Sequence, residues 1–249
     1  MQEEHLTLEQ AVEQAKNEPS PSKPGITSYA QNFEDVMLWR ALGHIENGFY
    51  IDIGAHHHSK DSVSKAFYDR GWSGINVEPL DYHYKNLLVH RPNDINLKAV
   101  VGRTTGQISF FQLDGLSTAV KSIADNHHNL YSKGEWTTSQ QITLFDILEY
   151  SRNREVHWLK IDAEGNEPDI IDGWGASARR PWVIVVESTI PNSRISIHHR
   201  FEEAILSRDY AFVYSDSLNR FYLSNAHREL TKYFQDPPNV FDNFKLKLE

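Results

Sequence analysis

Residues 49–79 restrict the fold of this chain more than any other segment. An apolar run at residues 49–53 predicts a short buried strand, and Gly54 follows it as a breaker that lets the backbone pass close to a ligand. Val63, Ala66, Phe67 and Arg70 then recur at helical spacing, with a glycine at position 71 where a helix C-cap is expected. The segment therefore predicts a strand, a turn and a helix in succession.

A second strand, residues 75–77, follows the predicted helix and ends at Glu78, twenty-four residues after Gly54. A carboxylate at that place in a nucleotide-binding crossover can accept both ribose hydroxyls of an adenosine. Dinucleotide sites use three glycines in the turn to cradle a pyrophosphate, whereas this turn has Gly54, Ala55 and then three histidines. The pattern favours a nucleoside without phosphates, and a purely structural crossover is the alternative.

Length and composition predict one main globular domain, because 249 residues with 39% apolar content can bury a sizeable core. The formal net charge of −9 argues against a nucleic-acid partner bound through bulk electrostatics. The chain has no cysteine, which excludes disulfides, thiolate metal ligands and cysteine nucleophiles.

The first residues, MQEEHLTLEQ, lack the apolar core of a secretory signal, and no run approaches the roughly 20 apolar residues of a membrane span. We therefore expect a cytoplasmic protein without a membrane span. Thr7 and Gln10 are spaced like a capping box and, with Leu6, Leu8 and Val12, predict a short helix before the Pro/Ser-rich residues 19–24. Residues 1–27 are expected to be a helical arm or flexible segment, and residues 28–249 the main domain.

Strands and helices alternate through the rest of the chain, which predicts an α/β fold with parallel strands and right-handed crossovers. Five parallel strands and a C-terminal antiparallel hairpin give an expected seven-stranded sheet with helices on both faces. Helices are expected at residues 34–42 and 144–150, further strands at 96–101, 158–162, 182–187, 211–215 and 220–223, and an inserted hairpin arm at 108–112.

Seven short motifs together resemble the FkbM-type S-adenosylmethionine-dependent methyltransferases, over about residues 29–244. They are SYAQNFEDV, YIDIGA with DSV, GWSGINVEP, LKIDAEGNE, VIVVES, RFYLSN and PPNVFDNF. The resemblance implies a class I methyltransferase, Rossmann-like sheet and transfer of a methyl group to a hydroxyl, often on a sugar. The histidine run at residues 56–58 departs from the family pattern, which has one histidine or asparagine there.

For S-adenosylmethionine we expect Glu78 at the ribose and Asp52 with Gly54 beside the methionine portion, while His56 lines the turn. The helix N-terminus near Ser62 favours the amino-acid carboxylate. Gln31 and Asp35 are further candidates for holding that tail. Their alternative role is that of polar residues at the start of a helix, facing water.

The predicted catalytic residues are Asp162, Glu164 and Glu187. Asp162 and Glu187 end two predicted core strands, where ligands bind in open α/β sheets. By analogy with other sugar O-methyltransferases, these two are also candidate ligands for Mg²⁺ or Mn²⁺. Glu164 is expected as general base or third ligand. Alternatively, the segment after Asp162 only caps a helix through Ile170 and Ile171.

Three further features have weaker interpretations. Adjacent histidines, such as the pairs at 127–128 and 198–199, diverge in direction and rarely chelate one ion. Residues 115–119, GLSTA, are a candidate acceptor loop. DPPN at residues 236–239 is expected to form a turn that packs Val240, Phe241 and Phe244 onto the domain, rather than a nucleic-acid methyltransferase motif.

The sequence thus favours an O-methyltransferase acting on a sugar or glycoconjugate, such as a surface polysaccharide or glycosylated metabolite. One alternative is a catechol-like small-molecule O-methyltransferase, with strict divalent-metal dependence and a hydrophobic acceptor pocket. Another is a non-catalytic nucleoside-binding module. A nicotinamide-dependent enzyme is disfavoured by the missing glycines, and homo-oligomerisation is left open.

Overall fold

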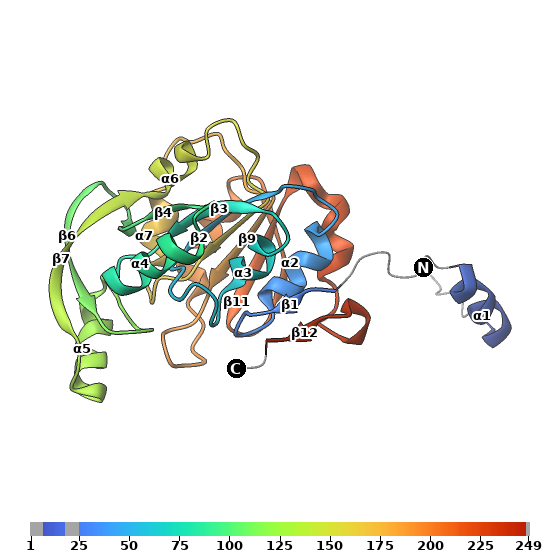
Figure 1. Ribbon diagram of the computed structural model, residues 1–249, viewed down its shortest axis with the longest axis horizontal. Helices are drawn as coiled ribbons and strands as arrows, with labels where there is room; N and C mark the ends of the chain where they lie inside the picture. The colour runs from blue at the N-terminus through green and yellow to red at the C-terminus, as the bar shows by residue number, and fades with distance from the viewer. Residues whose placement is uncertain (1–6, 18–24, 248–249) are drawn as a thin grey trace.

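The computed structural model describes residues 7–17 and 25–247 and centres on a mixed seven-stranded sheet (Figure 1). In spatial order its strands are β10 (Tyr210–Ser215), β11 (Asn219–Ser224), β9 (Val183–Glu187), β8 (Trp158–Ile161), β2 (Phe49–Ile53), β3 (Ser73–Val77) and β4 (Ile95–Leu97). The run from β9 to β4 is parallel, and β11 pairs antiparallel with both of its neighbours. The expected α/β fold and C-terminal hairpin are confirmed.

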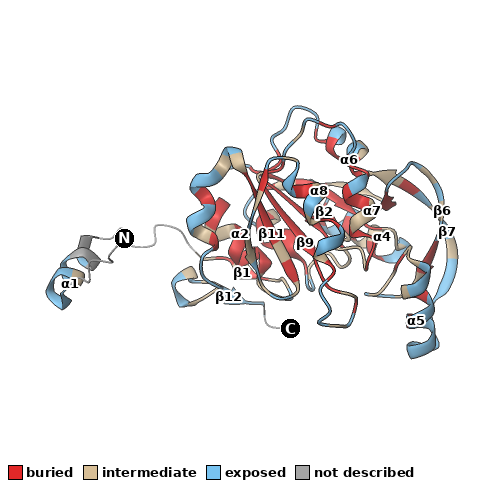
Figure 2. Cartoon of the chain, turned by 180° about the vertical axis from the view of Figure 1, so that it is seen from behind, coloured by how far each residue is buried: buried red, intermediate tan, exposed pale blue. Residues whose placement is uncertain are grey.

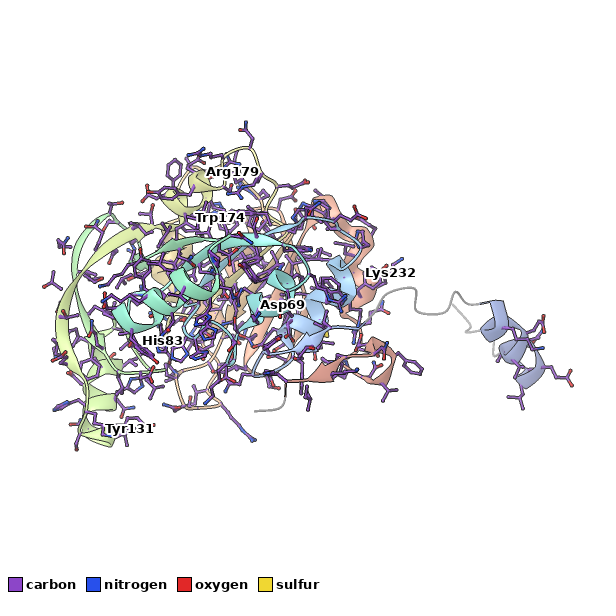
Figure 3. The ribbon with its side chains drawn as sticks, in the orientation of Figure 1. Asp69, His83, Tyr131, Trp174, Arg179 and Lys232 are labelled. Carbon is purple, nitrogen blue, oxygen red and sulfur yellow. The ribbon has the colours of Figure 1, made fainter. Side chains whose placement is uncertain are left out.

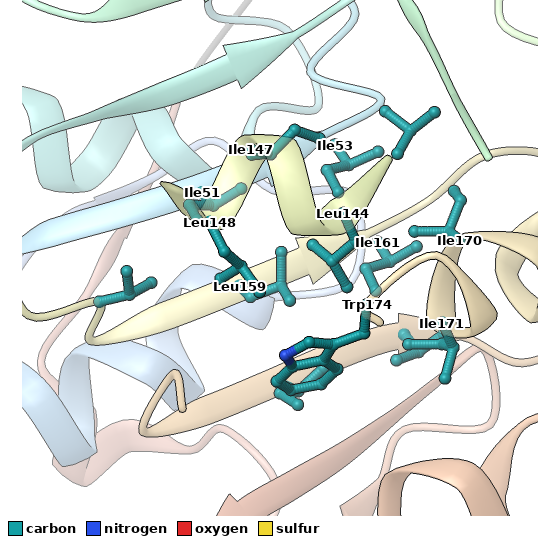
Figure 4. Packing of buried hydrophobic residues seen from close by; sticks show 14 of the residues in the cluster. Ile51, Ile53, Leu144, Ile147, Leu148, Leu159, Ile161, Ile170, Ile171 and Trp174 are labelled. Atoms are coloured by element: carbon teal, nitrogen blue, oxygen red, sulfur yellow. The ribbon is translucent and has the colours of Figure 1, made fainter. Parts of the chain in front are cut away.

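Apolar residues on both sides of the sheet explain why its strands read as continuous hydrophobic runs. On one face Phe49, Ile51 and Ile53 pack with residues of α6 (Leu144–Tyr150), α7 (Glu167–Asp172) and α8 (Glu202–Leu206). Figure 4 shows part of this cluster, with Trp174 among the labelled residues.

The opposite face is covered by α2 (Glu34–Leu42), α3 (Val63–Tyr68) and the 3₁₀ segment η2 (Asn225–Phe234). Tyr50 and Trp158, neighbours in the β2–β8 register, stack with ring centroids 4.9 Å apart. Figure 2 shows the buried residues concentrated on the sheet strands. The strict alternation of side chains along β2 thus sends Asp52 to the same face as Tyr50.

The prediction of a single strand at residues 96–101 is wrong, because these residues belong to two different strands. β4 ends at Leu97 in the main sheet, and β5 (Val100–Gly102) instead pairs parallel with β7 (Glu135–Thr143). β7 also pairs antiparallel with β6 (Gly106–Gln112), so the expected arm exists but closes with β7. The helix α5 (Lys121–Tyr131), between β6 and β7, was not predicted.

Smaller elements complete the described chain. They are α1 (Leu8–Asn17), the parallel pair β1 (Thr27–Ser28) and β12 (Lys245–Leu246), α4 (Asp81–His90), η1 (His198–Arg200) and η3 (Val240–Asp242). The predicted capping box precedes α1, because Thr7 N–H donates to Gln10 Oε1 at 2.9 Å and Gln10 N–H to Thr7 Oγ1 at 3.3 Å. Leu6 and residues 19–24 lie outside the described residues. No described helix is both long and apolar enough to cross a membrane.

Two local expectations need correction. The C-cap of α3 is Asp69, and Gly71 follows in a left-handed turn with φ +85°. The turn at residues 236–239 packs only Phe244 as expected, with its ring centroid 5.5 Å from that of Phe33. Val240 and Phe241 are exposed, because the η3 turn directs them away from the domain.

Candidate active site

A cavity of about 300 Å³ lies at the carboxyl ends of β2, β3 and β8, and we call it the main cavity. Its volume is at the lower end of the usual range for small-molecule sites. Its polar and turn residues are Gln31, Asp52, Gly54, His56, Asp61, Ser62, Glu78, Gly115, Ser117, Lys160, Asp162, Glu164 and Asn166. Six of the seven residues predicted at the donor therefore line one cavity.

Gly54 allows the turn after β2 to pass against the end of β8. Its φ is +79°, and a Cβ atom there would lie 1.8 Å from the carbonyl oxygen of Asp162. An L-residue at Gly54 would therefore meet both backbone strain and a backbone clash. His56, two residues on, also has a positive φ of 47°.

Glu78, directly after β3, holds the turn that follows β2. Its Oε2 accepts the backbone N–H of His56 at 2.9 Å, and its Oε1 accepts that of Leu80 at 2.7 Å. Burial raises the pKa of Glu78 to about 7, although both backbone hydrogen bonds act in the opposite direction. The side chain keeps acceptor capacity for a ligand hydroxyl at each oxygen.

A buried arginine at the end of α4 fixes the rest of the turn. The Arg91 guanidinium donates to the carbonyl of His58 at 2.8 Å and to the hydroxyl of Ser62 at 3.1 Å. It also lies 3.3 Å from the Tyr50 hydroxyl. Ser62 therefore lines the cavity with its hydroxyl already engaged, and the histidine run has a rigid backbone.

Asp35 does not reach the cavity, contrary to expectation, and it does not face water either. Its fully buried carboxylate accepts the Ser28 hydroxyl at 2.7 Å and the backbone N–H groups of Tyr29 and Ala30 at 2.7 and 3.2 Å. These three hydrogen bonds hold the segment before α2 in place, so Asp35 has a structural role. Gln31, from the same segment, does line the cavity.

An adjoining cavity of about 480 Å³ meets the main cavity. The wall shared by both is lined by Gln31, Gly115, Leu116, Asp162 and Glu164. Beyond it lie Glu187, Thr189, Asn192, Ser193, Arg194 and Leu218. The second cavity is therefore mainly polar, and two of the predicted catalytic carboxyl groups stand where the cavities meet.

Lys160 was not predicted from the sequence; it is buried and lines the main cavity beside this wall. Its Nζ donates to Asp162 Oδ2 at 2.6 Å. Burial alone would lower the pKa of Lys160, but the charges of Asp162, Asp52 and Glu34 raise it overall. A lysine inside an otherwise apolar parallel strand is itself a signal, because lysine is rarely buried without a partner.

The carboxyl groups around the shared wall repel one another. Burial, and then the charge of Asp162, raises the pKa of Glu164 to about 9. The same two causes raise the pKa of Glu187 well above its ordinary value, and its Oε2 is buried without a hydrogen-bond partner. Asp52 also has a raised pKa, because burial outweighs the attraction of Lys160. This region therefore favours an added positive charge.

Glu167 has a structural role in the segment after Asp162. Its Oε1 accepts the backbone N–H groups of Ala163 and Gly165 at 2.9 and 3.2 Å, which closes the turn before α7. The Thr118 hydroxyl donates to the carbonyl of Glu164 at 2.8 Å and secures that residue, whose φ is 53°. The loop 113–119 is thereby joined to the shared wall.

The predicted divalent-metal ligands find no support in this arrangement. Asp162 is paired with Lys160. Within the described ranges, Asp162, Glu164 and Glu187 do not bring ligand atoms within 4.8 Å of one another as a group of three. A preformed octahedral oxygen site of the Mg²⁺ kind needs closer convergence.

Comparisons with known proteins identify a family for this chain. Residues 52–214 match the family described as "Methyltransferase FkbM domain". No curated protein matches the sequence. Two similar solved structures are an FkbM methyltransferase from Methylobacillus flagellatus KT and a TehB-like SAM-dependent methyltransferase from Corynebacterium glutamicum ATCC 13032 Kitasato.

The first structure has 14% identity and a TM-score of 0.42, over 72% of this chain and 43% of that one. The second has 7% identity and a TM-score of 0.42, over 76% and 86%. The chain thus spans less than half the length of the Methylobacillus protein. The family match alone covers more than half of this chain, from the end of β2 to β10. The chain therefore belongs to the FkbM methyltransferase family.

Proposed function

We propose that this protein transfers the methyl group of S-adenosylmethionine to a hydroxyl of a polar, sugar-like acceptor. The observation that carries the proposal is the shared wall, where Asp162 and Glu164 line both cavities. A donor in the main cavity and an acceptor in the adjoining one would meet there. Strands of the mixed α/β sheet end at these two cavities, which supports the proposal.

The charge of the main cavity suits this donor. Asp52, Asp162 and Glu164 line it with Lys160, so that carboxyl groups outnumber the ammonium group. A sulfonium cation would reduce the repulsion that raises the pKa of Glu164. Glu78 would accept the ribose hydroxyls and the turn at Gly54 would contact the methionine portion. Nothing in the turn offers the glycine-rich cradle of a pyrophosphate.

The adjoining cavity favours a hydroxylated acceptor over a catechol-like one. Thr189, Asn192, Ser193 and Arg194 offer hydroxyl, amide and guanidinium groups, whereas Leu116 and Leu218 are its only large apolar residues among those described. A sugar presents many hydroxyls that such groups can bind. A flat aromatic ring would instead require a hydrophobic pocket.

We assign Asp162 as the base. A base must be ionised before the reaction, and burial holds Glu164 protonated at neutral pH by raising its pKa to about 9. Lys160 holds Asp162 through Oδ2, which leaves Oδ1 for the acceptor. The acceptor proton passes to Asp162 while the acceptor oxygen attacks the methyl carbon. The carbon–sulfur bond breaks, its electron pair stays on sulfur, and the products are a methyl ether and S-adenosylhomocysteine.

Calorimetry and a methyl-transfer assay together test the proposal. We expect S-adenosylmethionine and S-adenosylhomocysteine to bind, NADH not to bind, and mass spectrometry to detect methylation of a member of a sugar and glycoside panel. Asp162→Asn should retain product binding and lose turnover by at least about 100-fold, the lower range for general-base catalysis. Asp125→Asn on α5, whose exposed carboxylate pairs with Lys121, is the matched control.

The outcomes separate the alternatives. Absence of binding of either nucleoside would refute the methyltransferase proposal. Binding without turnover on any acceptor, unchanged by Asp162→Asn, would indicate a nucleoside-binding module. Methylation of catechols in preference to sugars would refute the acceptor class.

A further inference from the structure

Three residues distant in the sequence converge at the rim of the main cavity. They are His56 in the turn after β2, His83 on α4 (Figure 3) and Asp114 in the loop after β6. His56 Nε2 lies 2.9 Å and His83 Nε2 2.7 Å from the same oxygen, Asp114 Oδ1. One potential ligand atom from each residue lies within 4.8 Å of the others.

We propose that His56, His83 and Asp114 bind one divalent transition-metal ion of the Zn²⁺ kind. Two imidazole nitrogens and one carboxylate oxygen suit Zn²⁺, Co²⁺, Ni²⁺ or Cu²⁺, whereas Mg²⁺ and Ca²⁺ prefer oxygen ligands alone. The site is separate from Asp162 and Glu187, and it is the one group of this kind among the described histidines and carboxylates.

The geometry needs little adjustment to admit the ion. Zinc bonds of about 2.0–2.2 Å place tetrahedral ligands roughly 3.4 Å apart, so the two nitrogen–oxygen distances of 2.9 and 2.7 Å must each lengthen by roughly 0.5 to 0.7 Å. Asp114 can move by that amount, because its side chain is 78% exposed. His83 is buried, and Arg91 and Glu78 hold the backbone of the turn that carries His56, so the His83 ring and the His56 backbone are set in place.

The convergence of both rings on one carboxylate oxygen fits a shared ion. The two rings lie with centroids 3.9 Å apart, and both Nε2 atoms face the same oxygen of Asp114. If the neutral His83 ring donates from Nε2 to Asp114, its Nδ1 carries a lone pair. This Nδ1 is buried and has no hydrogen-bond partner. In a ring that binds metal through Nε2, the same atom would carry a hydrogen without an acceptor, which lowers metal affinity about 10- to 100-fold. We therefore expect micromolar rather than tighter binding.

The ion would join the loop 113–119, which carries Asp114, to the turn after β2, which carries His56. Gly115, Leu116 and Ser117 of that loop line the main cavity, and the backbone N–H of His56 donates to Glu78. If the proposed function holds, metal binding should close this rim and strengthen binding of the nucleoside donor. Metal binding itself does not depend on that function.

The test is calorimetric titration of the tag-free full chain with Zn²⁺, with Co²⁺ absorption as a second readout. We expect one ion per chain, with tetrahedral-type Co²⁺ bands, and at least a tenfold loss of affinity in Asp114→Asn and in His56→Asn. Asp114 is exposed, so that variant should fold. His90→Asn is the matched control, because exposed His90 stacks on His58 at 3.9 Å with no carboxylate in the pair.

Zn²⁺ binding that is unchanged in Asp114→Asn, or lost equally in His90→Asn, would overturn the site. S-adenosylhomocysteine is then titrated with and without Zn²⁺. Metal binding without any change in the nucleoside Kd would uphold the site and overturn its link to the donor. Failure of nucleoside binding under both conditions would refute the proposed function while leaving the metal result intact.

Discussion

Binding of the nucleoside should depend on pH through one side chain, Glu78. Both of its oxygens already accept a backbone N–H, and burial raises its pKa to about 7. To accept two ribose hydroxyls it must be ionised, because a protonated carboxyl group has a hydrogen on one oxygen. The free protein must therefore release a proton from Glu78 before it binds ribose at acid pH.

The size of the effect follows from that pKa of about 7. Well below pH 7, each unit of pH should weaken binding about tenfold, which corresponds to about 1.4 kcal/mol. Between pH 8 and pH 5.5 the fraction of ionised Glu78 falls about 30-fold, so the Kd should rise about 30-fold.

Calorimetry with S-adenosylhomocysteine from pH 5.5 to 8 measures this dependence. The product lacks the sulfonium charge, so coupling to Asp162 and Glu164 is reduced. Glu78→Gln should bind at least tenfold more weakly at pH 8 and lose the pH dependence, whereas Glu46→Gln, an exposed control, should behave like the wild type. A wild-type Kd that stays constant across this range, or a Glu78→Gln variant with the same slope, would refute the reasoning.

Three further predictions concern the end of the sheet. Gly54→Ala should abolish nucleoside binding in calorimetry, because its Cβ would lie 1.8 Å from the Asp162 carbonyl oxygen. The control Gly71→Ala has a similar φ but open space around it, so it should keep binding and lose only about 1–2 kcal/mol of stability. Lys160→Met should lower the free energy of unfolding by about 1–3 kcal/mol in urea titrations, because it leaves Asp162, whose side chain is 34% exposed, unpaired. Lys160→Met with Asp162→Asn should recover part of that loss, and equal losses would contradict the pairing. Burial raises the pKa of Glu164 to about 9, so the stability that Glu164 contributes is fully present below about pH 4.5 and is lost as the pH rises towards 9. The melting temperature of the protein should therefore fall from pH 6 to pH 8.5, and Glu164→Gln should reduce that fall.

Local patterns predicted the part of the site that is local in sequence. The strand, the glycine turn and Glu78 follow one another within residues 49–79, and all of them line or frame the main cavity. Asp162 and Glu187 were found by the same rule, since each stands at the end of a buried strand. Parallel strand order then brought these segments to one edge of the sheet.

Other residues could not be predicted because tertiary contacts determine their roles. Asp114 meets His56 and His83 only after the unpredicted β6–β7 pairing and the Phe111–Thr118 bridge have positioned its loop. Asp35 looked available to a ligand, but the segment just before it folds back and uses its carboxylate. The break between β4 and β5 likewise depends on Gln141, a distant partner for Val100.

A crystal structure with S-adenosylhomocysteine tests the central claim most directly. The proposed function predicts the nucleoside in the main cavity, with both ribose hydroxyls on Glu78 and the sulfur facing the wall formed by Asp162 and Glu164. A nucleoside bound elsewhere, or in the main cavity with its ribose away from Glu78 and its sulfur away from that wall, would contradict the account.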